Sequence, residues 1–122
     1  MARILIIDDS AFQRKIITSV LKGADHTVIT ATNGHEGLTK AVHEKPELII
    51  SDLLMPEMDG CMFLSEAKKA GLSTPVLILT SDVQIATRNR CIALGAFGVL
   101  NKPVNKDALL ELIQTALSGR VT

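Results

Sequence analysis

The chain alternates short, continuously apolar runs with longer segments in which apolar residues recur three or four positions apart. The run at 4–7 is apolar at every position, which is typical of a strand buried on both faces of a sheet. The run that begins at 28 is shorter and more mixed, which indicates a strand nearer the edge. The expected strands lie at 4–7, from 28, at 48–50, at 76–79 and at 97–100.

Helical patterns fill the gaps between these runs. Ser10 is placed to cap the first helix and Gly23 to end it, and Asp59 is the expected cap of the third helix. The expected helices lie at 10–23, at about 34–45 before Pro46, at about 60–71, between 81 and 95, and around 109–117. In the first of them residues 16, 17, 20 and 21 share one side, and in the last the apolar stripe consists of residues 109, 112, 113, 116 and 117.

Strands that alternate with helices predict a parallel sheet covered by helices on both faces. Right-handed crossovers restrict the topology, and a five-stranded chain of 122 residues best fits the doubly wound, flavodoxin-like order 2-1-3-4-5. With 47% hydrophobic residues and no linker or low-complexity segment, residues 1–122 are expected to form one α/β domain.

Charge and composition argue against several classes of function. Thirteen basic and thirteen acidic residues give a formal net charge of zero, which argues against direct nucleic-acid binding. No stretch approaches the roughly 20 apolar residues of a membrane span, and no basic amphipathic segment suggests a membrane surface, so a cytoplasmic protein is expected. Cys61 and Cys91 lack metal or redox spacing and are expected to be buried or half-buried thiols. Exposed positions are expected for His26, His35 and His43.

Polar residues follow four of the expected strands at the point where each strand ends. These ends carry Asp8-Asp9, Ser51-Asp52, Thr80-Ser81 and Asn101-Lys102-Pro103. Because the carboxyl ends of parallel strands lie at one edge of the sheet, three carboxylates, a hydroxyl and an ammonium are expected to converge there.

Crowded carboxylates repel one another unless a positive charge offsets them. A hard cation with few protein oxygen ligands and an open, water-filled remainder suits Mg²⁺ better than Ca²⁺. The lysine can pair with a carboxylate or with a phosphoryl oxygen, and the threonine hydroxyl can donate to such an oxygen. Together these groups predict a site that builds and holds an acyl phosphate, with a carboxylate attacking phosphorus.

Each of these residues has a plainer explanation when it is taken alone. Asp9 or Ser10 after a strand is often only a helix cap. Asp52 can be a turn residue before Pro56, and a Lys-Pro pair is usually a loop. The placement of all of them at separate strand ends favours the shared site.

At these positions the sequence resembles the receiver domains of bacterial response regulators, a family that includes the single-domain chemotaxis receiver protein. The resemblance spans about residues 2–117. It rests on ILIIDDS at 4–10, DLLMPEMDG at 52–60, LTS at 79–81, GA at 95–96 and KP at 102–103.

The resemblance implies a phosphorylation-dependent switch of a two-component system. In this family pattern Asp52 is the phosphoacceptor, and a histidine kinase or a phosphotransfer protein supplies the phosphoryl group. Mg²⁺ is then bound by Asp9, Asp52 and the backbone carbonyl of Leu54, with Asp8 acting through water.

The resemblance also assigns roles beside the acidic residues. Thr80 would move toward the phosphoryl group and Lys102 would be its ion-pair partner, and the bond from Lys102 to Pro103 is often cis in the family. A downstream protein would bind the face formed by the fourth helix, fifth strand and fifth helix. The implied molecule is a regulatory domain rather than an enzyme, and a monomer or weak dimer.

One position departs from the family pattern. Three residues before the lysine the family often has an aromatic residue that turns inward on activation, and here the position is Val99. A valine cannot report the state of the pocket through a large rotamer change, so coupling is expected to run through the loop after Thr80 and the following helix. Phe97 is expected to point to the other face of the strand and to belong to the core.

Leu54 and Asp82 lie two positions after Asp52 and Thr80, and both are candidates for setting the lifetime of the acyl phosphate. Leu54 would shield the phosphoryl group from water, and Asp82 would orient a water or repel an anionic donor. Both can also be ordinary loop residues at the rim of the pocket.

Two other functions fit the same topology. A flavin-binding protein would need a hydroxyl- or glycine-rich phosphate loop after the first strand, where this chain has Asp8 and Asp9, which repel phosphate. A receiver-like interaction module without chemistry usually lacks an acidic residue or the lysine, and this chain has all of them.

Overall fold

The computed structural model describes residues 1–118, which form a five-stranded parallel sheet with five helices. The strands are β1 (Arg3–Ile7), β2 (Thr27–Ala31), β3 (Leu48–Asp52), β4 (Val76–Thr80) and β5 (Gly98–Asn101). The helices are α1 (Ala11–Gly23), α2 (Gly34–Glu44), α3 (Gly60–Lys69), α4 (Ile85–Ala93) and α5 (Lys106–Leu117). Among these helices, none combines the length and apolarity needed to cross a membrane.

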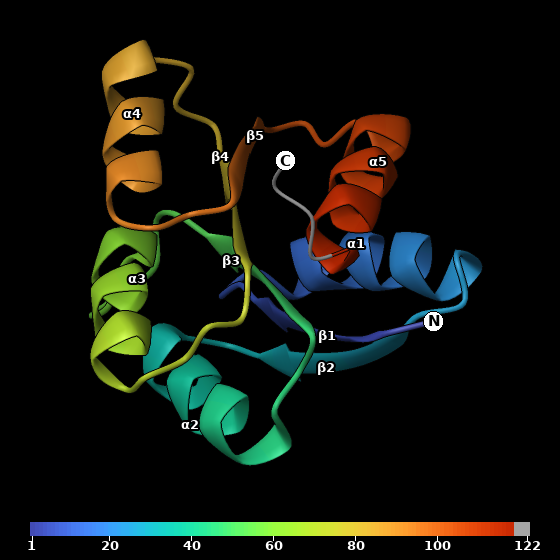
Figure 1. Cartoon of the computed structure of the whole chain (residues 1–122). Helices are drawn as coiled ribbons and strands as arrows, with labels where there is room; N and C mark the ends of the chain where they lie inside the picture. The colour runs from blue at the N-terminus through green and yellow to red at the C-terminus, as the bar shows by residue number, and fades with distance from the viewer. Residues whose placement is uncertain (119–122) are drawn as a thin grey trace.

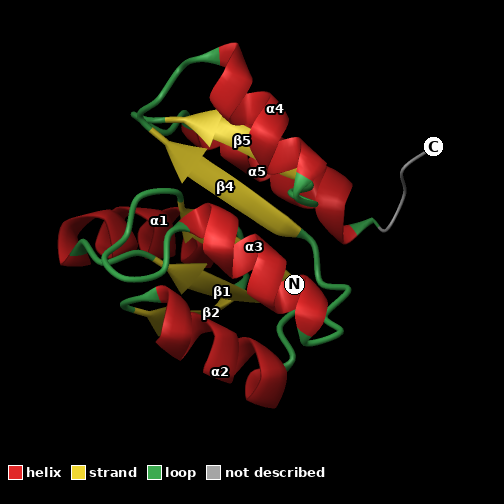
Figure 2. Ribbon diagram, turned by 90° about the vertical axis from the view of Figure 1, so that its left-hand side faces the viewer, coloured by secondary structure: helices red, strands yellow, loops and turns green. Residues whose placement is uncertain are grey.

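The strand order is β2-β1-β3-β4-β5 with every neighbouring pair parallel, which confirms the predicted doubly wound topology. The strand that was expected near an edge, β2, is an edge strand. Helices α1 and α5 cover one face of the sheet, and α2, α3 and α4 cover the other (Figures 1 and 2).

The core is divided by the sheet into two layers because side chains alternate between the faces of each strand. In β1, Leu5 and Ile7 pack with buried residues of α2, α3 and α4. The intervening Ile4 and Ile6 pack with buried residues of α1 and α5. All four side chains are at most 1% exposed, as expected for a strand buried on both faces.

The register of the strands brings their carboxyl ends to one edge of the sheet. Ile7 pairs with Ser51, Asp52 pairs with Leu79, and Thr80 pairs with Asn101. The residues that follow β1, β3, β4 and β5 therefore emerge side by side, which is the arrangement that the predicted site requires.

Two helix caps agree with the sequence prediction. The Ser10 hydroxyl accepts a hydrogen bond from the Gln13 N–H at 3.2 Å, and an Asp59 carboxylate oxygen accepts one from the Met62 N–H at 2.8 Å. Each bond satisfies a backbone donor that the first turn of a helix leaves without an intrahelical partner. The fourth helix begins only at Ile85, several residues into the segment that was assigned to it.

The thiols and two of the histidines are placed as predicted. Cys91 is buried, Cys61 is half-buried, and His35 and His43 are exposed. The expectation for His26 was wrong, because it is half-buried where the N-terminal strand begins.

The ring of His26 has a specific partner in the chain. Its Nδ1 accepts a hydrogen bond from the Ala2 N–H at 3.1 Å. Burial is the main cause that lowers the pKa of His26 below its ordinary value, and the nearby N-terminal ammonium adds to it.

Val99 and Phe97 pack on opposite faces of the sheet, as expected. Val99 is buried in the layer of α2, α3 and α4, whereas Phe97 is half-buried against the layer of α1 and α5. Residues two apart in a regular strand share a face, so alternation does not explain this arrangement. The reason is that β5 begins at Gly98, one residue later than expected, and Phe97 precedes the regular strand.

Candidate functional site

Three carboxylates meet where β1 and β3 end. Asp8 and Asp9 follow the last residue of β1, and Asp52 is the last residue of β3. One carboxylate oxygen from each of the three lies within 4.8 Å of the others, so the acidic cluster predicted from the strand ends is present. Asp8 is only 3% exposed, which places part of the cluster below the protein surface.

Lys102 reaches this cluster from the end of β5. Its Nζ lies 3.0 Å from Asp52 Oδ1 and 3.7 Å from Asp8 Oδ2. The Lys102 side chain is 16% exposed and the Asp52 side chain 12%, so water screens this pair far less than it screens a surface ion pair. A single ammonium offsets only part of the charge of the three carboxylates.

The electrostatics of Asp8 reflect this crowding. Burial is the main cause that raises the pKa of Asp8, and the negative charges of Asp52 and Asp9 raise it further. The Ser10 N–H, which donates to Asp8 Oδ1 at 2.9 Å, and the Lys102 ammonium act in the opposite direction. The site therefore favours a positive partner near Asp8.

The donor set fits a hard divalent cation. Carboxylate oxygens are the ligands that Mg²⁺ takes from proteins, and it keeps several waters when few protein ligands are available. The cluster of Asp8, Asp9 and Asp52 offers such oxygens at mutual distances that one ion can bridge. These residues could therefore hold the metal that the sequence predicts.

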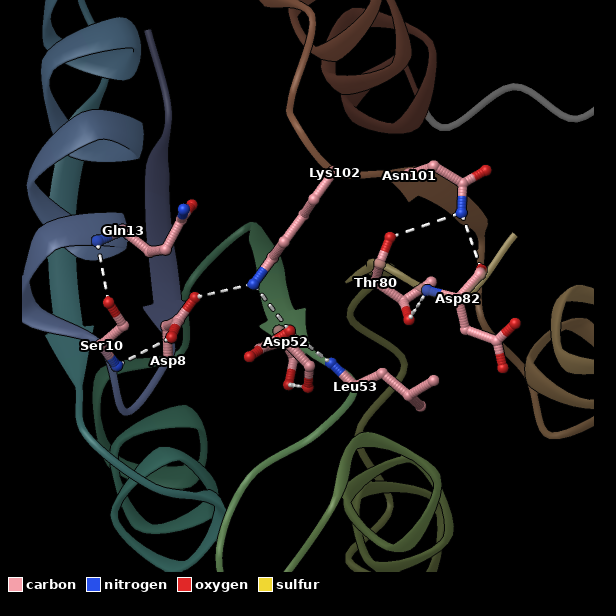
Figure 3. Close-up of polar contacts among 10 residues, drawn as sticks. Asp8, Ser10, Gln13, Asp52, Leu53, Thr80, Asp82, Asn101 and Lys102 are labelled. Atoms are coloured by element: carbon pink, nitrogen blue, oxygen red, sulfur yellow. Dashed lines mark hydrogen bonds and ion pairs between the residues drawn. The ribbon is translucent and has the colours of Figure 1, made fainter. Parts of the chain in front are cut away.

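Thr80 ends β4 beside the cluster, and its side chain is 1% exposed. Its hydroxyl oxygen accepts a hydrogen bond from the Asp82 N–H at 3.0 Å, and within residues 1–118 it makes no hydrogen bond to Asp52. Its carbonyl accepts from the Lys102 N–H at 2.8 Å. The structure therefore places Thr80 next to the site, with its hydroxyl directed to the loop that follows (Figure 3).

The two candidates for tuning the acyl phosphate differ in their surroundings. Leu54 lies in the loop after β3, two positions after Asp52, and is 70% exposed. Asp82 accepts hydrogen bonds from the Gln84 N–H at 2.9 Å and from the Thr87 hydroxyl at 2.6 Å. Both of its carboxylate oxygens are thus engaged at the start of α4, and within residues 1–118 these hydrogen bonds tie the carboxylate to the helix and not to Asp52.

Sequence reasoning assigned no role to two residues that shape the site. Arg14 of α1 donates from Nη1 to the carbonyl of Asp8 at 2.7 Å and so holds the turn after β1. Asn101 donates from its amide to the Asp82 carbonyl at 2.8 Å. The position of Asn101, directly before Lys102 at a strand end, was the signal that could have identified it.

The peptide bond between Lys102 and Pro103 is cis. This agrees with what the family resemblance implied for that bond.

Comparison with known proteins gives a consistent result along the chain. Residues 4–114 match the response regulator receiver domain family. The chain is 40% identical over 116 residues to the transcriptional regulatory protein GlrR of Escherichia coli, a match that covers 95% of this chain and 26% of GlrR. It therefore spans about a quarter of the length of that relative.

Two further relatives match along nearly their whole length. Protein PilH of Pseudomonas aeruginosa is 35% identical over 121 residues, covering 98% of this chain and 100% of PilH. The solved structure of the chemotaxis response regulator CheY4 of Vibrio cholerae has a TM-score of 0.88 at 36% identity, covering 96% of this chain and 99% of that one. Given this match, the shared topology and the acidic cluster at the strand ends, the chain belongs to the receiver domain family of two-component response regulators.

Proposed function

We propose that Asp52 is the phosphoacceptor of this receiver domain and that its Oδ2 is the attacking atom. Asp52 Oδ1 accepts a hydrogen bond from the Leu53 N–H at 3.0 Å and pairs with Lys102 Nζ at 3.0 Å. Within residues 1–118, Oδ2 has no such partner, so its lone pairs are available to an incoming phosphorus. This unequal use of the two oxygens is the observation that carries the proposal.

The transfer balances as a displacement at phosphorus. Asp52 Oδ2 forms the new bond to phosphorus, and the bond from phosphorus to the imidazole nitrogen of a phosphohistidine breaks. The released imidazole nitrogen takes up a proton from water. A histidine kinase or a phosphotransfer protein presents the phosphohistidine.

The proposed metal ligands are Asp9, Asp52 and the backbone carbonyl of Leu54, with Asp8 acting through water. The mutual approach of the three carboxylates within 4.8 Å supports the acidic part of this set. A bound Mg²⁺ supplies positive charge that offsets the negative charge of the phosphoryl group during transfer.

Lys102 and Thr80 hold the product. The Lys102 ammonium already lies at Asp52 and can pair with a phosphoryl oxygen on that residue. The Thr80 hydroxyl donates to a second phosphoryl oxygen once its side chain has turned toward Asp52. Two such charge-assisted hydrogen bonds contribute roughly 3–6 kcal/mol. A change in population from 1:99 to 99:1 needs about 5.5 kcal/mol, so the contacts have the size that a switch requires.

The proposed output is altered binding of a downstream protein to the face formed by α4, β5 and α5. The beginning of α4 and the loop before it present apolar side chains to solvent, since Val83 and Ile85 are each 74% exposed. Ile92, later in the same helix, is 44% exposed. Exposed apolar side chains of this kind are typical of surfaces that bind protein partners.

The proposal is tested by incubating the chain with acetyl phosphate and Mg²⁺ and measuring the intact mass. The expected result is the addition of one phosphoryl group to the natural chain and none to Asp52→Asn. Asp107→Asn, an exposed acidic residue in the first turn of α5, is the matched control and should be modified like the natural chain.

Beryllofluoride, which mimics an aspartyl phosphate, provides an independent measurement. With Mg²⁺ it should shift the amide resonances of the site residues in an NMR spectrum. If neither reagent changes the mass or the spectrum, the chain is an interaction module without receiver chemistry, and the proposal is wrong.

A further inference from the structure

Asp82, in the loop between β4 and α4, is hydrogen-bonded to three parts of the molecule. Its N–H donates to the Thr80 hydroxyl oxygen at 3.0 Å. Its carboxylate accepts from the Gln84 N–H at 2.9 Å and from the Thr87 hydroxyl at 2.6 Å, which ties it to the first turn of α4. Its carbonyl accepts from the Asn101 amide at 2.8 Å, which ties it to the end of β5 (Figure 3).

Asn101 connects this loop to the residue that senses Asp52. Its amide nitrogen lies 2.8 Å from the Asp82 carbonyl oxygen and 3.4 Å from the Thr80 carbonyl oxygen. The next residue, Lys102, pairs with Asp52 at 3.0 Å. Two consecutive residues at the end of β5 therefore contact the phosphoacceptor and the β4–α4 loop.

A second hydrogen bond joins α4 to the same strand. Arg88 of α4 donates from Nη1 to the Val99 carbonyl oxygen at 2.9 Å. The Val99 side chain is 3% exposed and β-branched, so it is confined in the core and has no large rotamer change to make. The hydrogen bond that joins α4 to β5 at this position thus uses the Val99 backbone, while the Val99 side chain stays fixed in the core.

The Thr80 hydroxyl cannot stay at the Asp82 N–H and also contact a phosphoryl group on Asp52. Side-chain rotamers are separated by about 120°, so turning the hydroxyl toward Asp52 carries its oxygen away from the Asp82 N–H. That N–H then loses its acceptor, which favours movement of the β4–α4 loop. Asn101 opposes this movement because it holds the Asp82 carbonyl.

We propose that Asn101 is a positioning residue that latches the β4–α4 loop in the resting state, so that Thr80 is coupled to α4 through Asp82 and Asn101. In this chain the latch takes the place of an aromatic side chain at position 99. The proposal rests on phosphorylation of Asp52, which supplies the group toward which Thr80 turns.

The test compares the binding of beryllofluoride with Mg²⁺ by the natural chain and by Asn101→Ala, followed by NMR titration. A contact made only in the resting state lowers the apparent affinity for an activating ligand, so its removal should tighten binding about 2- to 10-fold. In Asn101→Asp the side chain keeps its shape, but its two oxygens can only accept hydrogen bonds and so cannot bind the Thr80 and Asp82 carbonyl oxygens. This variant should therefore bind beryllofluoride at least as tightly as Asn101→Ala.

Asn89→Ala is the matched control, since Asn89 is an exposed asparagine of α4 for which residues 1–118 provide no side-chain hydrogen bond. It should leave beryllofluoride binding unchanged. Hydrogen exchange of the Asp82 amide, measured without any phosphoryl analogue, gives a second readout. It should be faster in both Asn101 variants and unchanged in the control.

The outcomes separate the two proposals. If the natural chain binds no beryllofluoride, the proposed function fails and the coupling fails with it. If the natural chain binds but the Asn101 variants bind equally or more weakly, the latch is overturned while the proposed function stands. Unchanged exchange of the Asp82 amide in those variants would also overturn the latch.

Discussion

Gly60, the first residue of α3, packs directly against the backbone that carries the phosphoacceptor. A Cβ added at Gly60 would lie 2.9 Å from the Asp52 carbonyl oxygen and 3.0 Å from the Leu53 Cα. The Gly60 N–H also donates to the Leu53 carbonyl at 2.7 Å, which fixes the spacing of the two segments. Neither backbone neighbour can rotate aside, so Gly60→Ala must displace the turn after β3.

The size of the effect follows from two opposing contributions. Forcing a methyl group into a packed position costs about 1–3 kcal/mol. Alanine is favoured over glycine in a helix by up to about 1 kcal/mol, which offsets part of this cost. We therefore expect Gly60→Ala to lower the free energy of unfolding by about 1–2 kcal/mol and to weaken beryllofluoride binding, because the Asp52 carboxylate moves with its backbone.

Gly23→Ala provides the matched control, because a Cβ at Gly23 would meet nothing within 4 Å beyond its chain neighbours and the backbone of its own helix. It should leave stability unchanged or raise it by up to about 1 kcal/mol. Urea unfolding followed by far-UV circular dichroism measures both variants, since the chain has no Trp or Tyr for fluorescence. A midpoint for Gly60→Ala equal to or above that for Gly23→Ala would refute the packing argument.

Three further predictions concern stability and the lifetime of the phosphoryl group. Lys45, the exposed residue after α2, has a left-handed φ of 50°, so Lys45→Gly should raise the free energy of unfolding by about 0.5–1 kcal/mol in urea denaturation. Because the pKa of His26 is lowered in the folded chain, the unfolded chain takes up a proton on this residue at a higher pH than the folded chain does. Proton binding then favours unfolding, so the free energy of unfolding is retained above the ordinary pKa of 6.5 and falls as the pH drops below it. His26→Gln should lose less stability over that range in the same assay, and an equal loss would exclude His26 as the cause. Leu54→Asn should speed the loss of the phosphoryl group from Asp52 in a mass time course, and an unchanged rate would rule out the shielding role.

Much of the fold could be predicted from the sequence because its strands are marked unambiguously. Runs of consecutive β-branched and leucine residues have few alternatives to a strand buried on both faces. The start of α4 was harder to place, since Gln84 caps it without a side-chain hydrogen bond and the segment begins with loop residues. His26 was misassigned because its partner, the Ala2 N–H, lies 24 positions away and no local pattern indicates that contact.

The acidic part of the site could also be predicted, because parallel strands bring their carboxyl ends together regardless of side-chain detail. The hydrogen bonds of the Asp82 carboxylate could not be predicted, because a carboxylate beside a helix start can face either the pocket or the helix. Its engagement by Gln84 and Thr87 depends on the path of the loop. Asn101 was named at a strand end but received no role, because its partner Asp82 lies 19 positions away.

The residues of the acidic site come from strand ends that are far apart in the sequence, so the unfolded chain has no such cluster. Any ligand of Asp8, Asp52 and Lys102 therefore binds the native state alone and adds to its stability by mass action. At a ligand concentration 100 times its dissociation constant, the gain is about 2.7 kcal/mol. The melting temperature of the chain thus reports site occupancy, and thermal shifts can rank metal ions and reversible phosphoryl analogues without any label or output assay.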